Sequence, residues 1–226
     1  MTTPRDREVL AQALETGFTE ETILGWRVKV NAAFRASNPD TIAAALALLQ
    51  RELAAIVAAL PPQRLTPLQA TVFWLDERVH EGAAAAKAPT FHPDRGWLSA
   101  HGLNPDMAGG IELPNAQDFI DSYSWEPWAI MHELAHVYHL RVLGENNEAI
   151  RGAFEHARDA GLYGNVKRYD GSIVPKAYAL ENEREYFAEL TEAYFGRNDY
   201  FQFTRDELAQ YDPTGFAMIR KMWEGR

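Results

Sequence analysis

Hydrophobic and polar residues follow distinct spacings along the first third of the chain. Residues 25–30 alternate between apolar and charged side chains after Gly25, which predicts a half-buried β-strand. Residues 40–60 carry Ala and Leu at helical spacing and stop at Pro61-Pro62, which predicts a core helix. A second strand is expected within residues 68–79, where Thr, Val, Phe and Trp cluster. A helix is expected over residues 5–17, because that stretch ends at a glycine.

Short strand patterns and longer helical patterns share the rest of the chain. Residues 90–114 are dense in Gly, Pro, His and Trp, and predict an ordered irregular stretch that leads into a short strand over residues 109–113. Apolar runs on either side of the turn Asp170-Gly171 indicate a hairpin. A helix is expected over residues 126–143, with Pro127 near the start and Gly144 after the end, and another over residues 181–195, followed by Gly196. Residues 198–223 are expected to hold an acidic and aromatic turn region and a last helix.

This order of elements predicts an α+β fold. A small twisted mixed sheet with helices would form an N-terminal sublobe, about residues 1–144, and a mostly helical C-terminal sublobe would follow, about residues 145–226. The chain shows no internal repeat and no long linker. A single domain over residues 1–226 is therefore expected.

Composition narrows the classes of partner. Hydrophobic residues make up 46% of the chain, which is enough for a packed core and excludes a disordered chain. The formal net charge is −10 and no run of Lys or Arg could follow a phosphate backbone, so nucleic acid is not an expected partner. The weakly polar run over residues 41–60 is interrupted by Gln50, Arg51 and Glu52, so no membrane span is expected. Cysteine is absent, which excludes disulfides and cysteine-ligated metal sites.

The first ten residues indicate the cellular compartment. They include Arg5, Asp6, Arg7 and Glu8 and contain no apolar segment, so no signal peptide is expected. The sequence as it stands therefore predicts a cytoplasmic protein, and a secreted or periplasmic one if a leader has been removed. Its pattern does not indicate an oligomeric state.

The sequence His132-Glu133-Leu134-Ala135-His136 carries the clearest candidate chemistry. On a helix the two histidines lie about 40° apart, and His139 lies about 20° from His132, so the imidazoles share one stripe. Histidines four residues apart can bind one zinc ion, and the glutamate between them can activate a water molecule as a general base. For His139 a packed, hydrogen-bonded histidine or a group supporting a ligand is favoured over a direct ligand.

A third ligand must come from elsewhere in the chain. The metzincin pattern, in which a Gly and a further His follow closely, fails because residue 142 is Val. The best candidates lie on the helix over residues 181–195, where Glu185, Glu189 and Glu192 share one face among aromatic neighbours. Stacked carboxylates on an apolar helix favour a bound cation, while a solvated acidic face is the simpler alternative.

These residues resemble the glutamate-ligand zincin metallopeptidases, the gluzincins. The chain is most similar to the group that holds the anthrax lethal factor catalytic domain and the bacterial Pro-Pro endopeptidases, with the motif Glu185-Tyr186-Phe187-Ala188-Glu189 matching the family's second helix. The resemblance covers about residues 109–196. It implies a zincin-like fold, a single Zn²⁺ ion, Glu185 as third zinc ligand, Glu189 as support for a ligating histidine and Tyr178 as stabiliser of the tetrahedral intermediate. Toxin action and Pro-Pro specificity do not carry over.

The resemblance also implies a reaction. With three protein ligands the fourth zinc position stays open for water, Glu133 acts as general base, and the substrate is a peptide or protein, cut as by an endopeptidase. The strand with Gly110, Ile111 and Leu113, just upstream of the motif helix, is expected to bind an extended peptide at an exposed edge. Asn115 is expected to bind the substrate backbone, although a turn after Pro114 explains it equally well.

Two other interpretations stay open. A zincin-fold protein without proteolytic activity would bind zinc and act as a binding module, with a blocked cleft. A purely structural helical protein would carry the motif by accident, and His136 would then lie far from Glu185. Peptide deformylases share the His-Glu-x-x-His motif but need a cysteine ligand, which this chain lacks.

Overall fold

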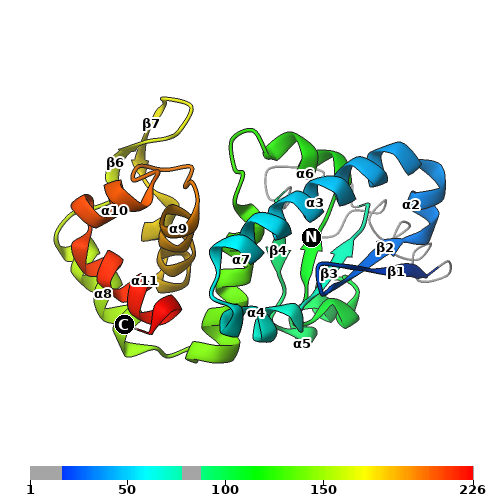
Figure 1. The fold of residues 1–226 in the computed structure, drawn as a ribbon, viewed down its shortest axis with the longest axis horizontal. Coiled ribbons are helices and arrows are strands. Elements are labelled where there is room, and N and C mark those ends of the chain that lie inside the picture. Colours follow the sequence, from blue (N-terminus) through cyan, green and yellow to red (C-terminus); the bar gives the residue numbers. More distant parts are fainter. Residues whose placement is uncertain (1–16, 78–87, 226) are drawn as a thin grey trace. The chain divides into compact units, whose positions relative to one another are not determined.

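The computed structural model describes residues 17–77 and 88–225. It is a mixed α+β protein with a small mixed sheet and several helices (Figure 1). The chain divides into two compact units, described here one at a time. Of the described residues, unit 1 comprises 17–54, 69–77 and 88–122, and unit 2 comprises 55–68 and 123–225. The single-domain assignment stays a prediction.

A five-stranded sheet forms the centre of unit 1. Its strands are β1 (Phe18–Ile23), β2 (Trp26–Asn31), β3 (Val72–Leu75), β5 (Ile111–Leu113) and β4 (Thr90–Phe91), in that spatial order. The pairs β2–β3 and β3–β5 are parallel, while β1 and β4 run antiparallel to their neighbours at the two edges. In β2 the alternation predicted from sequence is confirmed, because Trp26, Val28 and Val30 are fully buried.

Helices complete unit 1. They are α2 (Ala32–Ser37), the first part of α3 (Pro39–Ala59), α5 (Arg95–Ala100), the 3-10 turn η1 (Pro105–Met107) and α6 (Ala116–Ser122). Trp74 of β3 packs in one core cluster with Leu98, Leu103 and Met107. The stretch over residues 90–114, expected to be irregular, therefore holds a helix and a 3-10 turn that cover this part of the sheet core.

Unit 2 is mostly helical. It contains the end of α3, most of α4 (Pro62–Gln69), α7 (Ala129–Tyr138), the π-helical turn η2 (His139–Leu143), α8 (Glu148–Asp159), the hairpin β6 (Gly164–Lys167) and β7 (Ile173–Lys176), the 3-10 turn η3 (Tyr178–Leu180), α9 (Glu183–Phe195), α10 (Arg205–Tyr211) and α11 (Pro213–Glu224). Trp223 of α11 is fully buried, and its ring stacks on Tyr138 at a centroid distance of 4.1 Å. Helix α11 therefore packs against the end of α7.

Most predicted elements are confirmed, and the differences have local causes. The hairpin, the strands over residues 26–31 and 111–113, and the helices over residues 39–59 and 183–195 lie where expected. Leu68, expected in a strand, belongs to α4, which begins at Pro62. The motif helix begins at Ala129 rather than Glu126, and the C-terminal stretch forms two helices because Asp212 caps a new one at Pro213. The helix expected over residues 5–17 lies outside the described residues.

Helix α3 is the one described helix that is long and apolar enough to cross a membrane by length and composition alone. A core helix passes the same test. Its buried residues Ile42, Ala45, Leu49, Leu53 and Ile56 recur every three or four positions, which is typical of a helix with one face in a core. The length test is therefore weak evidence for a span.

Candidate metal centre

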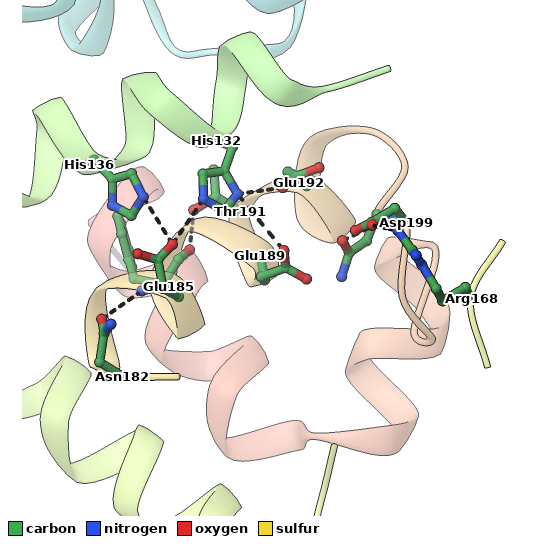
Figure 2. A network of polar contacts seen from close by, with 11 residues as sticks. His132, His136, Arg168, Asn182, Glu185, Glu189, Thr191, Glu192 and Asp199 are labelled. Carbon is green, nitrogen blue, oxygen red and sulfur yellow. Dashed lines mark hydrogen bonds and ion pairs between the residues drawn. The ribbon is translucent and has the colours of Figure 1, made fainter. Parts of the chain in front are cut away.

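Two helices of unit 2 supply the candidate metal ligands. Most side chains of α7 are buried, and on α9 every residue from Tyr186 to Tyr194 is buried, so each helix has little exposed surface. The two helices pack against each other. At the start of α9 the Asn182 side chain accepts hydrogen bonds from the backbone N–H groups of Arg184 and Glu185, which fixes the first turn. This packing places the histidines of α7 opposite the glutamates of α9 (Figure 2).

His132, His136 and Glu185 come together at one point. The Oε2 atom of Glu185 lies 3.1 Å from Nε2 of His132 and 3.2 Å from Nε2 of His136. Ligand atoms around a tetrahedral zinc ion, each about 2.0–2.1 Å from the metal, are about 3.3 Å apart. One ligand atom from each of the three residues lies within 4.8 Å of the others, so the group could hold a metal ion. The large separation of His136 and Glu185 that would support a purely structural protein is therefore not found.

The second ring nitrogen of His132 also meets a carboxylate. Nδ1 lies 2.7 Å from Oε1 of Glu192 and 3.9 Å from Oε1 of Glu189. Only the first distance is that of a hydrogen bond. The sequence predicted that Glu189 would support a ligating histidine, and the structure instead places Glu192, one turn further along α9, as the hydrogen-bond partner of His132.

Hydrogen bonds between His132, His136 and the glutamates of α9 shift the pKa values of His132 and Glu185. Burial lowers the pKa of His132, but hydrogen bonds to Glu185 and Glu192 outweigh burial and leave that pKa well above its usual value. Burial raises the pKa of Glu185, and its hydrogen bonds to His132 and His136 reverse the shift, so the net pKa is well below its usual value. Glu185 is therefore ionised at neutral pH, as a metal ligand must be.

Further acidic residues surround His132. Burial raises the pKa of Glu192 to about 8 and that of Glu126 to about 7, and burial also raises the pKa of Glu189 and Asp199. Within the described part of the chain, neither Oε2 of Glu189 nor Oε2 of Glu192 has a hydrogen-bond partner. Arg168 Nη2 approaches Oδ2 of Asp199 at 3.5 Å, at the far side of the network in Figure 2. So many buried carboxylates repel one another, and a bound cation would relieve that repulsion.

The two predicted catalytic residues lie beside the ligands. Tyr178, on η3, is 44% exposed, and its ring centroid is 6.2 Å from that of His132. Burial, together with the charge of Glu185, raises the pKa of Tyr178 to about 12, so its hydroxyl keeps its proton at neutral pH and can donate a hydrogen bond. Glu133 is half-buried on α7, and its charge acts on both His132 and Tyr178.

His139 is packed but lacks the expected hydrogen bond. It is 2% exposed, and its ring meets Phe187 edge to face at a centroid distance of 5.4 Å. Among the described residues neither ring nitrogen has a hydrogen-bond partner. Burial, with a contribution from the charge of His136, lowers the pKa of His139 to about 4, so the ring is neutral at pH 7. His139 starts the π-helical turn η2 and is not part of the group of candidate ligands.

The residues predicted to bind substrate belong to unit 1. The prediction that this strand forms an exposed edge of the sheet is wrong. Strand β5 lies between β3 and β4, and Ile111 and Leu113 are buried. Gly110 allows a close backbone approach, since a Cβ atom there would lie 2.7 Å from the Val72 carbonyl oxygen. The Asn115 side chain accepts hydrogen bonds from the N–H groups of Gln117 and Asp118 at the start of α6, which agrees with the turn alternative.

Comparison with protein families, with characterised protein sequences and with solved structures gives no significant match to this chain. The case for a function therefore depends on the geometry of the site. Glu192 is the site residue whose role the sequence missed. Its spacing of seven residues from Glu185 put it on the correct face of α9, but spacing alone could not show which carboxylate meets His132.

Proposed function

We propose that this chain is a zinc-dependent peptidase of the gluzincin kind, with a zincin-like fold, that hydrolyses peptide bonds in a peptide or protein substrate. The observation that carries the proposal is the convergence of His132, His136 and Glu185 on one point beside Glu133. Two imidazoles and one carboxylate are a common ligand set of catalytic zinc, and three protein ligands leave one position open.

The residues present fit a zinc ion. Two imidazole nitrogens favour zinc or another transition metal over Mg²⁺ and Ca²⁺, which prefer oxygen ligands. The separations of 3.1 and 3.2 Å between Glu185 Oε2 and the two imidazole nitrogens suit a tetrahedral ion, and the ionised Glu185 carboxylate supplies compensating negative charge. Zinc, when bound, supplies a Lewis acid that lowers the pKa of water to about 7.

The side chains around the ligands have distinct tasks in this proposal. Glu133 follows His132 on α7, where its carboxylate accepts the proton of the attacking water and then donates it to the leaving amine. Tyr178 keeps its hydroxyl proton at neutral pH and donates a hydrogen bond to the oxyanion of the tetrahedral intermediate. His132 and His136 are held by α7, whose buried residues keep the rings in place.

The Glu133→Gln variant tests the proposed reaction. We expect it to bind zinc as the wild type does, because Glu133 is not a ligand, and to lose about 10²- to 10⁴-fold in kcat because the proton acceptor is gone. Metal analysis and cleavage of a peptide library give the two readouts. Glu155→Gln, which changes an exposed glutamate on α8, is the matched control and should cleave normally.

Two outcomes would contradict the proposal. Equal cleavage by the wild type and Glu133→Gln would refute Glu133 as the general base. A wild-type chain that binds zinc but cleaves no library peptide would instead support a zinc-binding module without proteolytic activity.

A further inference from the structure

We propose that Glu192 is a positioning residue that holds the His132 ring in the orientation needed for metal binding. This inference rests on the proposed zinc site and concerns the nitrogen of His132 that faces away from it. Nδ1 of His132 lies 2.7 Å from Oε1 of Glu192, while Nε2 lies 3.1 Å from the candidate ligand Glu185. The imidazole therefore lies between two carboxylates of the same helix, with one nitrogen directed at each (Figure 2).

The geometry of α9 explains how one helix reaches both nitrogens. Glu185 and Glu192 are seven residues apart, so their directions around the helix axis differ by only about 20° while they lie two turns apart along it. Glu185 lies near the start of α9, with its side chain 17% exposed. Glu192 lies deeper, with its side chain 1% exposed. The His132 ring fits between these two turns.

The hydrogen bond selects one tautomer of His132. When Oε1 of Glu192 accepts this hydrogen bond, the proton lies on Nδ1 of His132. The Nε2 atom of a neutral ring then presents its lone pair on the side of Glu185 and His136. A carboxylate that accepts from a ligating imidazole also makes that imidazole a stronger donor to the metal.

Charge supports the same assignment. A zinc ion brings two positive charges. A nearby cation favours the ionised form of Glu192 over the protonated form that burial favours, so with zinc bound Glu185 and Glu192 bring two negative charges. His132 and His136 add none when their rings are neutral. The group formed by the two histidines and these two glutamates is thus neutral with zinc bound, which favours keeping it in an environment where Glu192 is almost wholly buried.

Glu189 is the natural comparison, because it lies on the same face of α9 and is 3% exposed. Its Oε1 is 3.9 Å from Nδ1 of His132, which is too long for a hydrogen bond. It instead bonds to the side chain of Asn198, a buried residue outside the metal group. Glu189 and Glu192 are therefore both buried carboxyl groups on α9, and only Glu192 is within hydrogen-bond distance of His132.

The test compares zinc binding by Glu192→Gln with zinc binding by the matched control Glu189→Gln. Dissociation constants are measured by competition with a chromophoric chelator, and the visible absorption of the Co²⁺-loaded proteins reports the ligand field. We expect Glu192→Gln to raise the dissociation constant about 10- to 100-fold and to shift the Co²⁺ bands. Glu189→Gln should change the dissociation constant less than about 3-fold and leave the bands in place. Circular dichroism of the metal-free proteins establishes that each variant is folded.

A second variant at Glu192 keeps the test valid if the first does not fold. Should Glu192→Gln not fold, Glu192→Met fills a similar volume without an acceptor, and the same ranking of dissociation constants applies. An effect of Glu189→Gln equal to or larger than that of the change at Glu192 would overturn the inference. A wild-type chain that binds zinc and a folded Glu192→Gln that binds it equally well would overturn the inference and leave the proposed function intact. A wild-type chain that binds no zinc would overturn both.

Discussion

His132 and His139 show how the environment of a single residue sets the behaviour of a histidine. Both are buried and lie about two turns apart on one helical segment. His132 has carboxylates at both ring nitrogens, so its pKa is raised. His139 packs against Phe187 without a hydrogen-bond partner among the described residues, so burial lowers its pKa to about 4. The two positions look alike in sequence and differ because α9 places glutamates opposite only one of them.

His139 should make the stability of the metal-free protein depend on pH. Its pKa is about 4 in the folded chain and about 6.5 in the unfolded chain, so between these values the unfolded chain takes up a proton that the folded chain does not. The free energy of unfolding should therefore fall as pH drops through this window. Relative to His139→Leu, we expect the wild type to lose about 1 to 2 kcal/mol between pH 7 and pH 5. Urea unfolding with a chelator present measures the difference.

The exposed histidine His156 supplies the control for this measurement. His156→Gln should show the same pH dependence as the wild type. Titratable groups present in both the wild type and His139→Leu contribute equally to the pH dependence, so their contributions cancel in the difference. The same pH dependence in His139→Leu and in the wild type would show that His139 does not contribute.

At the residue scale, helical periodicity predicted that His132 and His136 share one face and that Glu185, Glu189 and Glu192 share another. The choice of Glu185 as third ligand came from the resemblance to the gluzincins, and the structure brings its carboxylate to the two histidines. The choice between Glu189 and Glu192 was beyond the sequence, because it depends on the axial offset between α7 and α9. Large side chains packed between the helices set that offset, among them Trp223, whose ring stacks on Tyr138 of α7 and on Phe187 of α9.

At the scale of the elements, a buried carboxylate at the start of α11 links several segments of unit 2. Asp212 is fully buried at the start of α11. Its Oδ1 accepts a hydrogen bond from the Gly215 N–H at 2.8 Å, and its Oδ2 accepts from the hydroxyls of Tyr163 at 2.9 Å and Tyr186 at 2.5 Å. One carboxylate thereby connects α11 to α9 and to the segment after α8.

Asp212→Ala should destabilise the protein far more than an ordinary cap substitution does. It removes the cap of α11 and leaves two buried hydroxyls without their acceptor, so we expect a loss of about 3 kcal/mol or more in the free energy of unfolding. Thr204→Ala, which removes the exposed capping box of α10, should cost about 1 kcal/mol. Urea unfolding of both variants gives the comparison. Equal costs for the two would mean that the tyrosine hydroxyls find other partners.

The elements themselves were predictable where one face is buried. The strand at β2 and the helix α3 have clear apolar periodicity. Helix α9 is buried all around from Tyr186 to Tyr194, and its end at Gly196 was the clearer signal. The sequence pattern did not predict strand β1, because its sequence Phe-Thr-Glu-Glu-Thr-Ile is largely polar. Its extended conformation is stabilised by backbone pairing with β2, which the pattern does not show. Glu20 of β1 forms two hydrogen bonds of 2.9 Å with Arg27 of β2, a contact that only the register of the pair creates.

For the whole molecule, the division into two units separates the sheet from the candidate metal centre. The three candidate ligands lie on α7 and α9, both in unit 2, while all five strands of the central sheet lie in unit 1. A ligand that binds only the folded form stabilises first the elements that hold it. Metal binding is therefore expected to act unevenly along the chain.

Zinc should slow amide hydrogen exchange more in unit 2 than in unit 1. We expect the largest protection in α7 and α9, which carry the ligands, and a smaller change in β1, β2 and β3. Hydrogen exchange followed by mass spectrometry, with and without zinc, measures it segment by segment. Glu185→Gln, which lacks the third ligand, should lose most of this protection. Equal protection in both units would show that they open together as one cooperative body.

The π-helical turn after α7 has a consequence for changes of chain length. Residues of η2 (His139–Leu143) form hydrogen bonds one residue wider than those of an α-helix, so this turn already accommodates an extra residue. A one-residue deletion there can be absorbed by conversion to an α-turn, and His132 and His136 upstream keep their facing. The same deletion between those two histidines would rotate one of them by about 100° away from Glu185. Related sequences that bind the same metal should therefore vary in length after His139 and never between His132 and His136.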